Sequence, residues 1–259
     1  MTTTEQQIAS LVEIGGQNLS LPQQIATAAQ AQIASVTTTY NNRIAGLTVS
    51  CYVDQVSGVD TNPGTQASPY KTMAKAVASV PRGGLGTIYV IGDYTMDAVV
   101  IIDGKRIKVK AIGSVRTNLQ FTRQTQVIGA TTHRVLTNFA LANGGSIVIE
   151  GLTVVMPTLD GNWGTFPVHA NLTGIVTLTQ SASSVNGMPF IGLIYCDLVI
   201  PAAPFCPLFG SYNIPHALYL TAVVNTDQDY KGKLYANYTS TSGTDPVTLP
   251  QLVTNLALV

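Results

Sequence analysis

The stretch Tyr52–Tyr94, YVDQVSGVDTNPGTQASPYKTMAKAVASVPRGGLGTIYVIGDY, separates two parts of the chain with different character. The residues before it are rich in Gln, Ala and Thr and favour helix, whereas short β-type runs follow it. We expect a strand at Cys51–Val53, a polar loop, and a short amphipathic helix around residues 73–80 that ends at Pro81. Thr87–Ile91 is then expected to be the first fully buried strand.

Three motifs of this stretch resemble a known family. They are GVDTNPGT at 58–65, SPYKT at 68–72, and GTIYV at 86–90 followed by GDY. In this order they are similar to the segment that opens the β domain in pectate-lyase-like right-handed β-helix proteins, above all in tail fibres and tailspikes of tailed bacteriophages. The resemblance implies a short right-handed parallel β-helix, a trimeric assembly and a structural role in a virion. The close match is confined to Tyr52–Tyr94, which we call the opening segment.

The composition is poor in charge. Charged residues make up 10% of the chain and the formal net charge is zero, so Thr, Ser, Asn and Gln must supply the solubility. Such a composition is typical of proteins packed into an assembly, where charged surface is costly to bury. No basic tail is present that would bind nucleic acid, so we expect no nucleic-acid partner.

The cysteines and the N-terminus indicate synthesis in a reducing cytoplasm. Cys51, Cys196 and Cys206 form an odd and sparse set, which does not fit a secreted disulfide framework and favours buried thiols. The N-terminal residues lack the pattern of a signal peptide. No apolar run approaches membrane-spanning length, so we expect no membrane insertion.

Two helices are predicted before the β region. The first covers residues 4–14 and is expected to break at Gly15 and Gly16. The second is expected to begin near Ser20, because the segment 20–23 reads as a capping box with Pro22 in the first turn. Gly46 is expected to end it.

The second helix carries a narrow apolar stripe whose spacings are 4, 4, 3, 4, 4 and 3. This is an eleven-residue repeat, which winds straight or slightly right-handed. A lone helix with so few charged pairs is marginal in water, so it needs a partner. The period favours a parallel, coiled-coil-like stalk over a helix docked along its own β domain, and the number three comes from the family resemblance. The stripe consists of Ile25, Ala29, Ile33, Val36, Tyr40, Ile44 and Leu47.

Short apolar runs recur from Leu85 to Val224 and are separated by turn dipeptides such as Asp103-Gly104 and Asn143-Gly144. Such runs fit an irregular solenoid, and they also fit a β-sandwich. The opening segment favours the β-helix, because its short helix would cover the end of the stacked strands. The expected fold is therefore mainly β, with a short right-handed parallel β-helix after an N-terminal helical stalk.

This gives a predicted division of the chain into four parts. An N-terminal attachment segment covers 1–17 and the helical stalk covers 18–48. The β-helix covers 49–226, with its cap at 52–94. A C-terminal strand and oligomerisation segment covers 227–259, where an apolar end is expected to pair with this subunit or a neighbour.

Carboxylates that could catalyse glycan cleavage are scarce. Depolymerases need two acids roughly 5 to 10 Å apart, and between Asp103 and Asp227 the only acids are Glu150, Asp160 and Asp197. Asp160 lies in a turn, and strand alternation points the other two outward. We therefore expect no catalytic residue within one chain, while a pair formed between subunits stays open.

Other reactive groups show no pattern of a site. His133, His169 and His216 lack metal-ligand spacing, and Cys196 and Cys206 lack the paired spacing of a zinc site. The glycines of 82–86 lack the lysine and the helix of a phosphate-binding loop. No metal and no cofactor are expected.

Two features are candidate binding surfaces. Arg106, Lys108 and Lys110 alternate with apolar residues, so a strand would place them on one face, as a basic ladder for phosphate-rich lipopolysaccharide or an acidic neighbour. An ordinary solvated face is the alternative. Trp163 and Phe166 lie in a long polar loop, where exposed aromatics bind ligands, although aromatics that cover the core are equally compatible.

The expected function is that of a structural virion protein of the tail-fibre or tailspike type. It would form a homotrimer, attach to tail or baseplate proteins, take part in adhesion to the host surface, and assemble in the host cytoplasm. Host surface polysaccharide is a candidate ligand. Two alternatives remain: a β-helix depolymerase of surface glycans, and a capsid fibre or decoration protein.

Overall fold

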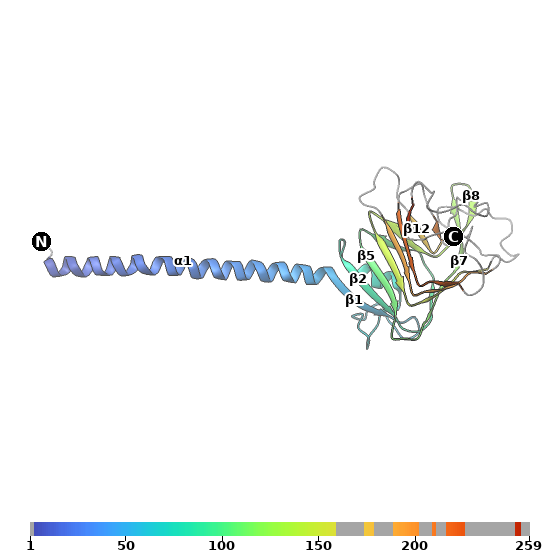
Figure 1. Cartoon of the computed structure of the whole chain (residues 1–259), viewed down its shortest axis with the longest axis horizontal. Coiled ribbons are helices and arrows are strands. Elements are labelled where there is room, and N and C mark those ends of the chain that lie inside the picture. Colours follow the sequence, from blue (N-terminus) through green and yellow to red (C-terminus); the bar gives the residue numbers. More distant parts are fainter. Residues whose placement is uncertain are drawn as a thin grey trace. The chain divides into compact units, whose positions relative to one another are not determined.

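A computed structural model describes residues 3–158, 174–178, 189–201, 209–210, 216–225 and 252–254. The chain divides into two compact units, Met1–Gly46 and Leu47–Val259. The first holds a long helix, and the second holds parallel β-sheets with one short helix (Figure 1). The chain is therefore mainly β with a long N-terminal helix.

The N-terminal helix α1 (Thr4–Leu47) is continuous over 44 residues. The predicted break at Gly15-Gly16 and the predicted new start at Ser20 are wrong. Glycine in a helix interior costs about 1 kcal/mol without forbidding the conformation, and propagation of an existing helix is far easier than nucleation. The Ser20 hydroxyl donates to the carbonyl oxygen of Gln17 at 2.9 Å, so this side chain bonds within the helix and caps nothing.

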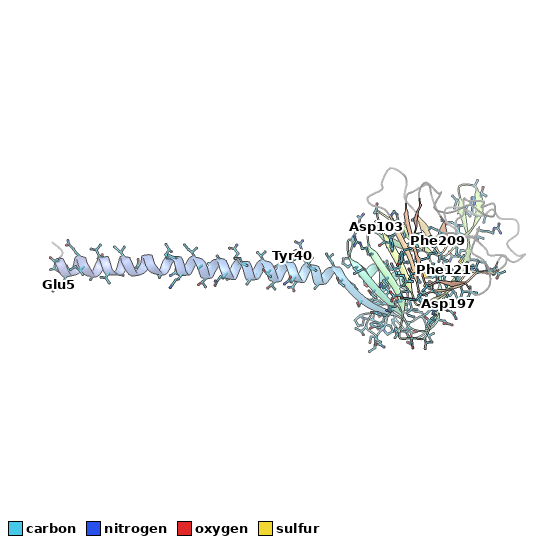
Figure 2. All side chains as sticks on the ribbon, viewed as in Figure 1. Glu5, Tyr40, Asp103, Phe121, Asp197 and Phe209 are labelled. Atoms are coloured by element: carbon cyan, nitrogen blue, oxygen red, sulfur yellow. The ribbon has the colours of Figure 1, made fainter. Side chains whose placement is uncertain are left out.

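The large apolar side chains of α1 are exposed, with exposed fractions from 38% to 70%. Tyr40 is one of them and projects from the helix (Figure 2). Every member of the predicted stalk stripe is exposed in this single chain, including Ala29. The exposed large apolar residues of the helix are Ile8, Leu11, Val12, Ile14, Leu21, Ile25, Ile33, Val36, Tyr40, Ile44 and Leu47.

The β unit opens with strand β1 (Thr48–Val53), a loop, helix α2 (Met73–Ser79) and strand β2 (Leu85–Val90). The Asp60 carboxylate orders the loop by accepting hydrogen bonds from the backbone N–H groups of Lys71 and Thr72, at 3.0 and 2.9 Å, and from the Thr72 hydroxyl at 2.8 Å. Thr72 in turn caps α2 by accepting from the N–H of Lys75. The loop polar residues thus start the helix where the sequence predicted one.

A glycine is required where the loop closes on itself. A Cβ on Gly58 would lie 2.2 Å from the Tyr70 carbonyl oxygen, which no side chain tolerates. Tyr70 is held there by its N–H, which donates to the Tyr52 carbonyl oxygen at 2.9 Å. The loop is therefore a compact, hydrogen-bonded structure.

Helix α2 covers the beginning of the stacked strands. It packs against β1, β2 and β4 (Val100–Asp103), of which β1 and β4 are edge strands. Two residues of the helix itself, Met73 and Val77, are buried, as their helical spacing predicted. The backbone N–H of Met73 donates to the hydroxyl oxygen of Tyr94 at 2.7 Å, which joins the helix to the next turn of chain.

The described strands form three parallel sheets that the chain visits in turn. The first sheet has the order β1-β2-β5-β10-β13-β16-β18, the second β17-β14-β11-β6-β3, and the third β15-β12-β9-β4. In the first sheet β5 is Arg106–Ala111, β10 Ser146–Glu150, β13 Phe190–Ile194, β16 His216–Thr221 and β18 Leu252–Thr254. In the second, β3 is Tyr94–Met96, β6 Asn118–Phe121, β11 Thr153–Val155, β14 Asp197–Val199 and β17 Val224–Asn225. In the third, β9 is Phe139–Ala142, β12 Val176–Leu178 and β15 Phe209–Gly210.

Parallel pairing decides between the two architectures that the sequence left open. A β-sandwich is built from antiparallel sheets, whereas every pair within these three sheets is parallel. The sandwich alternative is therefore wrong. Strand β18 lies in the predicted C-terminal segment and pairs with β16 of the same chain.

The core consists of identical registers repeated from strand to strand. In the first sheet Ile88 pairs with Val109, and the same row continues through Ile149, Leu193 and Leu220, all of them buried. Alternate residues face outward because successive side chains of a strand point to opposite faces. Strand β2 follows this rule, so the expectation that it is buried on both faces is wrong.

A hairpin that the sequence did not predict interrupts the parallel order. Strands β7 (Arg123–Ile128) and β8 (Thr131–Leu136) pair antiparallel between β6 and β9. Its base is fixed by two threonines: the N–H of Thr137 donates to the Thr122 carbonyl oxygen, and both hydroxyls donate to the Met96 carbonyl oxygen. The polar strand residues gave no apolar alternation, so the hairpin was not recognised.

Replacing Asp60 with alanine is expected to lower the free energy of unfolding by about 1–2 kcal/mol, because three hydrogen bonds to its carboxylate are lost. Partial desolvation raises the pKa of Asp60, but the hydrogen bonds from Thr72 and Lys71 outweigh it and hold the pKa below its ordinary value. The stabilisation is therefore complete above the ordinary pKa of an aspartate and is lost as the pH falls through the lowered one. Urea unfolding of both proteins at several pH values measures this.

The exposed Asp97 provides the control. Asp97→Ala should change the free energy of unfolding by less than about 0.5 kcal/mol, as expected for an exposed side chain. Equal effects of the two substitutions would show that the Asp60 carboxylate does not hold the loop.

Candidate functional site

The predicted basic ladder exists as a face of β5. Arg106, Lys108 and Lys110 lie on the outer face of the first sheet, while Ile107 and Val109 are buried. This confirms the alternation that the sequence predicted. The three cations are alternate residues of the strand, so they lie in a row on one face of the β unit.

The two lysines of the ladder are paired with one acid. Lys108 Nζ lies 2.9 Å from Glu150 Oε2, and Lys110 Nζ lies 2.7 Å from Glu150 Oε1. The parallel register of β5 and β10 places Glu150 beside Lys110. Hydrogen bonds first from Lys110 and then from Lys108 hold the pKa of Glu150 below its ordinary value. The hydrogen bond to Glu150 raises the pKa of Lys110, so Lys110 and Glu150 form a charged pair at neutral pH.

The ladder therefore differs from a row of three free cations. Glu150 neutralises one of the two lysine charges, and Arg106 is exposed and takes part in none of the ion pairs found among the described residues. The three cations of the ladder and Glu150 together carry a formal net charge of +2. Such a face attracts an anionic group only weakly in salt, because exposed charges are screened.

Two tyrosines extend the same row of the sheet. The register runs from Tyr52 to Tyr89, Lys110 and Glu150 across β1, β2, β5 and β10. The rings of Tyr52 and Tyr89 stack with centroids 4.9 Å apart and an interplanar angle of 20°. Sequence reasoning missed this row, because only the register of strands far apart in the chain brings it together.

The other half of this outer face is apolar. The rings of Phe190 and Tyr219 stack with centroids 6.5 Å apart, across β13 and β16. Val148 and Ile194 lie on the same face and are half-buried. The outer face of the first sheet thus carries stacked tyrosines on β1 and β2, charged side chains on β5 and β10, and apolar and aromatic side chains on β13 and β16.

The acids considered as catalysts lie on different sheets, and each is paired with a cation. Glu150 lies on β10 of the first sheet, whereas Asp197 begins β14 of the second and forms an ion pair with Arg116. Both carboxylates face outward, as strand alternation predicted. Asp160 lies outside the described residues. A carboxylate with a lowered pKa, such as Glu150, is a poor proton donor near neutral pH.

A shallow cavity of about 460 Å³ lies where the opening segment meets the following strands. The Asp54 carboxylate at its wall accepts hydrogen bonds from the N–H groups of Val56 and Ser57 and from the Ser57 hydroxyl. Desolvation raises the pKa of Asp54, and these hydrogen bonds lower it further than burial raises it. This carboxylate is thus used to shape its own loop. The hydroxyl of Thr117, another wall residue, is buried and has no hydrogen-bond partner among the described residues.

The cysteines and histidines form no site in the part of the chain that the structure describes. Cys51 and Cys196 are buried, and burial raises the pKa of both thiols, as expected for unreactive core residues. Cys206 and His169 lie outside the described residues. No group of three His, Cys, Asp or Glu side chains with metal-binding geometry occurs within the described ranges.

The two aromatic candidates, Trp163 and Phe166, also lie outside the described residues. The structure thus brings together Lys108 and Lys110 with Glu150 and leaves Arg106 beside them. It places the stalk stripe on the exposed surface of α1.

None of the described helices combines the length and the apolar character that crossing a membrane requires. Comparisons with protein-family models, with curated proteins and with solved structures gave no match for this chain.

Replacing Glu150 with glutamine is expected to lower the free energy of unfolding by about 1 kcal/mol, because two lysines then lose their shared counter-charge. The effect should shrink in 1 M salt and at low pH, since the contribution of a carboxylate with a lowered pKa is lost as the pH falls through that value. Denaturant unfolding at low and high salt measures it.

A double-mutant cycle with Lys110→Met provides the control. The cycle should return a coupling of about 0.5–1 kcal/mol between Glu150 and Lys110. A coupling of zero would mean that the ion pair contributes nothing to the fold.

Proposed function

We propose that this chain is a structural protein of a bacteriophage virion, a tail-fibre or tailspike-like component that joins the tail or baseplate and takes part in adhesion to the host surface. It acts as a scaffold and catalyses no reaction. Two features together carry this proposal. One is a 44-residue helix with an exposed apolar stripe. The other is a set of parallel sheets whose first strands are covered by helix α2 of the opening segment.

The β unit is proposed to be a short right-handed parallel β-helix. Its strands follow the cyclic order of the three sheets, and parallel strands joined by crossovers are right-handed in nearly all proteins. Helix α2 packs on edge strands and would seal the first coil against solvent. A rigid solenoid of this kind holds surface side chains in fixed positions, which suits a protein that displays a binding face.

The helix α1 is proposed to assemble with two copies of itself as a parallel stalk. Its apolar stripe repeats every eleven residues from Ile25 to Leu47, and each large apolar side chain that is buried contributes about 1.5–3 kcal/mol. An isolated helix of this composition is marginal in water. Association of three copies would bury the stripe, and the low charge of the flanks raises little repulsion between identical helices.

The outer face of the first sheet is proposed to take part in adhesion. Arg106, Lys108 and Lys110 give it a positive region, next to the stacked Tyr52 and Tyr89. Phosphate-bearing surface glycans or acidic virion neighbours are the partners whose charge fits this face. Buried free thiols suit assembly in the host cytoplasm before incorporation in the virion.

The contacts of the carboxylates favour a scaffold over a glycan depolymerase. Glu150 and Asp197 are each bound by cations and lie on different sheets, whereas a depolymerase needs two acids that face one sugar ring. A reducing-sugar assay on host surface polysaccharide separates the two functions. Release of sugar by the purified chain would overturn the scaffold proposal.

The stalk is tested by sedimentation of the purified chain at micromolar concentration. The full chain should sediment as a trimer, and a chain starting at residue 49 should sediment mainly as a monomer, because the stripe is removed. A monodisperse full-length monomer would overturn the stalk.

A double substitution tests the stripe itself. Val36→Asp together with Tyr40→Asp should raise the dissociation constant of the trimer more than hundredfold, because burying two carboxylates in place of apolar side chains costs about 3 kcal/mol or more. The β unit should keep its circular dichroism and its thermal unfolding. Sedimentation equilibrium measures the association.

Ala31→Asp together with Thr38→Asp is the matched control. It adds the same two negative charges, but on the side of α1 opposite to the stripe. The control should remain a trimer. Loss of the β structure in the Val36/Tyr40 variant would instead show that α1 packs along its own β unit.

A further inference from the structure

The segments that join strands of the first sheet to strands of the second are short, with one exception. The segments 91–93, 151–152, 195–196 and 222–223 have three, two, two and two residues, whereas the segment 112–117 between β5 and β6 has six. The strands on both sides of it pair with their neighbours as the others do. The core thus does not require the added length, and loops on a rigid scaffold are where binding residues are disproportionately found.

The longer segment forms one wall of the cavity of about 460 Å³ at the opening segment. Ile112, Val115 and Thr117 line the cavity from this side, and Asp54 and Gln66 line it from the loop of the opening segment. A cavity of this size lies within the range of small-molecule sites. Val115 is apolar and yet 73% exposed, so it contributes to the wall of the cavity and not to the core.

The polar groups of this cavity can both donate and accept hydrogen bonds. The Gln66 side chain is exposed, and its amide takes part in no hydrogen bond among the described residues. The Thr117 hydroxyl is buried and unpaired there, and a rotation about its Cα–Cβ bond would exchange it with the methyl group. The Asp54 carboxylate accepts three hydrogen bonds, from the N–H groups of Val56 and Ser57 and from the Ser57 hydroxyl, which leaves about one of its four acceptor sites unused.

The charge around the cavity disfavours anions. None of the described residues that line it is Lys or Arg, and Arg116, the one cation of segment 112–117, is paired with Asp197. Desolvation raises the pKa of Asp54, but its hydrogen bonds lower it further, so the carboxylate is ionised at neutral pH. A phosphate, sulfate or carboxylate group of a ligand would therefore be repelled.

Cations and flat aromatic ligands fit the cavity poorly as well. A calcium ion takes about six to eight oxygen ligands, and the described residues contain no group of three acidic, His or Cys side chains that could hold a metal. An ammonium group would meet one partly exposed carboxylate whose acceptor sites are mostly used, and such a pair contributes little in water. None of the described lining residues is aromatic, so an aromatic ring would find no stacking partner.

We propose that this cavity binds a small neutral polyol of the size of one neutral monosaccharide. Hydroxyl groups of the ligand would bond to the Gln66 amide, to the Thr117 hydroxyl and to the remaining acceptor site of Asp54, while its C–H groups would contact Ile112 and Val115. This inference goes beyond the proposed function. The site shares no residue with the basic ladder, fits neutral groups where the ladder fits anionic ones, and does not depend on the formation of a trimer.

Binding is tested on the full chain with sugars of one ring size that differ in charge. The methyl glycosides of glucose, galactose and mannose are the neutral probes, and glucosamine and glucuronate are the cationic and the anionic probe at about pH 6. At least one neutral glycoside should bind with a dissociation constant of about 1–10 mM in a titration followed by saturation-transfer NMR. Both charged probes should bind at least fivefold more weakly. Failure of all three neutral glycosides, or tighter binding of a charged probe, would overturn the inference.

Two variants change the shape of the cavity without removing its polar groups. Deletion of residues 113–115 leaves a segment as long as 91–93, so the β unit should keep its circular dichroism while the dissociation constant of the glycoside rises at least tenfold. Ala67→Leu enlarges an exposed side chain that lines the cavity, and it should raise the dissociation constant at least fivefold. If the deletion variant fails to fold, Ala67→Leu still decides whether the ligand occupies this cavity.

Two further variants remove the polar groups one at a time. Gln66→Ala should raise the dissociation constant at least threefold, whereas Gln126→Ala, at an exposed glutamine of β7 that does not line the cavity, is the matched control and should leave it unchanged. Thr117→Val should raise the dissociation constant at least threefold without lowering the midpoint of thermal unfolding, because it removes a buried hydroxyl that has no partner. Unchanged affinity in both Gln66→Ala and Thr117→Val would overturn the inference.

Discussion

The β unit depends on a fixed register between parallel strands. Each strand of the first sheet buries alternate residues, and the buried residues stand beside those of the next strand, as Ile88 does beside Val109 and Val109 beside Ile149. A shift by one residue would expose every buried side chain of a strand at once. The core therefore tolerates change in the turns and very little in the strands. The opening segment sets the first register, because α2 and the Asp60-ordered loop fix β1 and β2 relative to each other.

The outer face follows from the same register. The cations of β5 and the acid of β10 meet because two strands separated by many residues align Lys110 with Glu150. Tyr52 and Tyr89 stack for the same reason. Few charges occur on this protein, and those of the first sheet are partly neutralised in place. This partial neutralisation lowers the cost of burying the face in the contact that is proposed for it.

Local sequence predicted the elements whose signals are strong. The opening segment, helix α2 around Met73 and Val77, the alternation of β5 and the outward direction of Glu150 and Asp197 all followed from spacing within a few residues. The continuity of α1 through Gly15 and Gly16 was missed, because local breaking signals weigh less than propagation of a long helix. The hairpin at Arg123–Leu136 was missed because its strands are polar. The row of Tyr52, Tyr89, Lys110 and Glu150 depends on long-range register, which single-sequence patterns do not contain.

The β7–β8 hairpin shows that the scaffold accepts an insertion between two strands without a change in their register. Arg106 pairs with Ser146 in the same way that Leu85 pairs with Arg106, although the hairpin lies between the first two and no comparable insertion lies between the others. Thr122 and Thr137 join the two ends of the hairpin at its base, so the strands before and after it keep the same pairing as strands without an insertion. The segments between strands can therefore be lengthened, shortened or exchanged while the buried rows of the core keep their register.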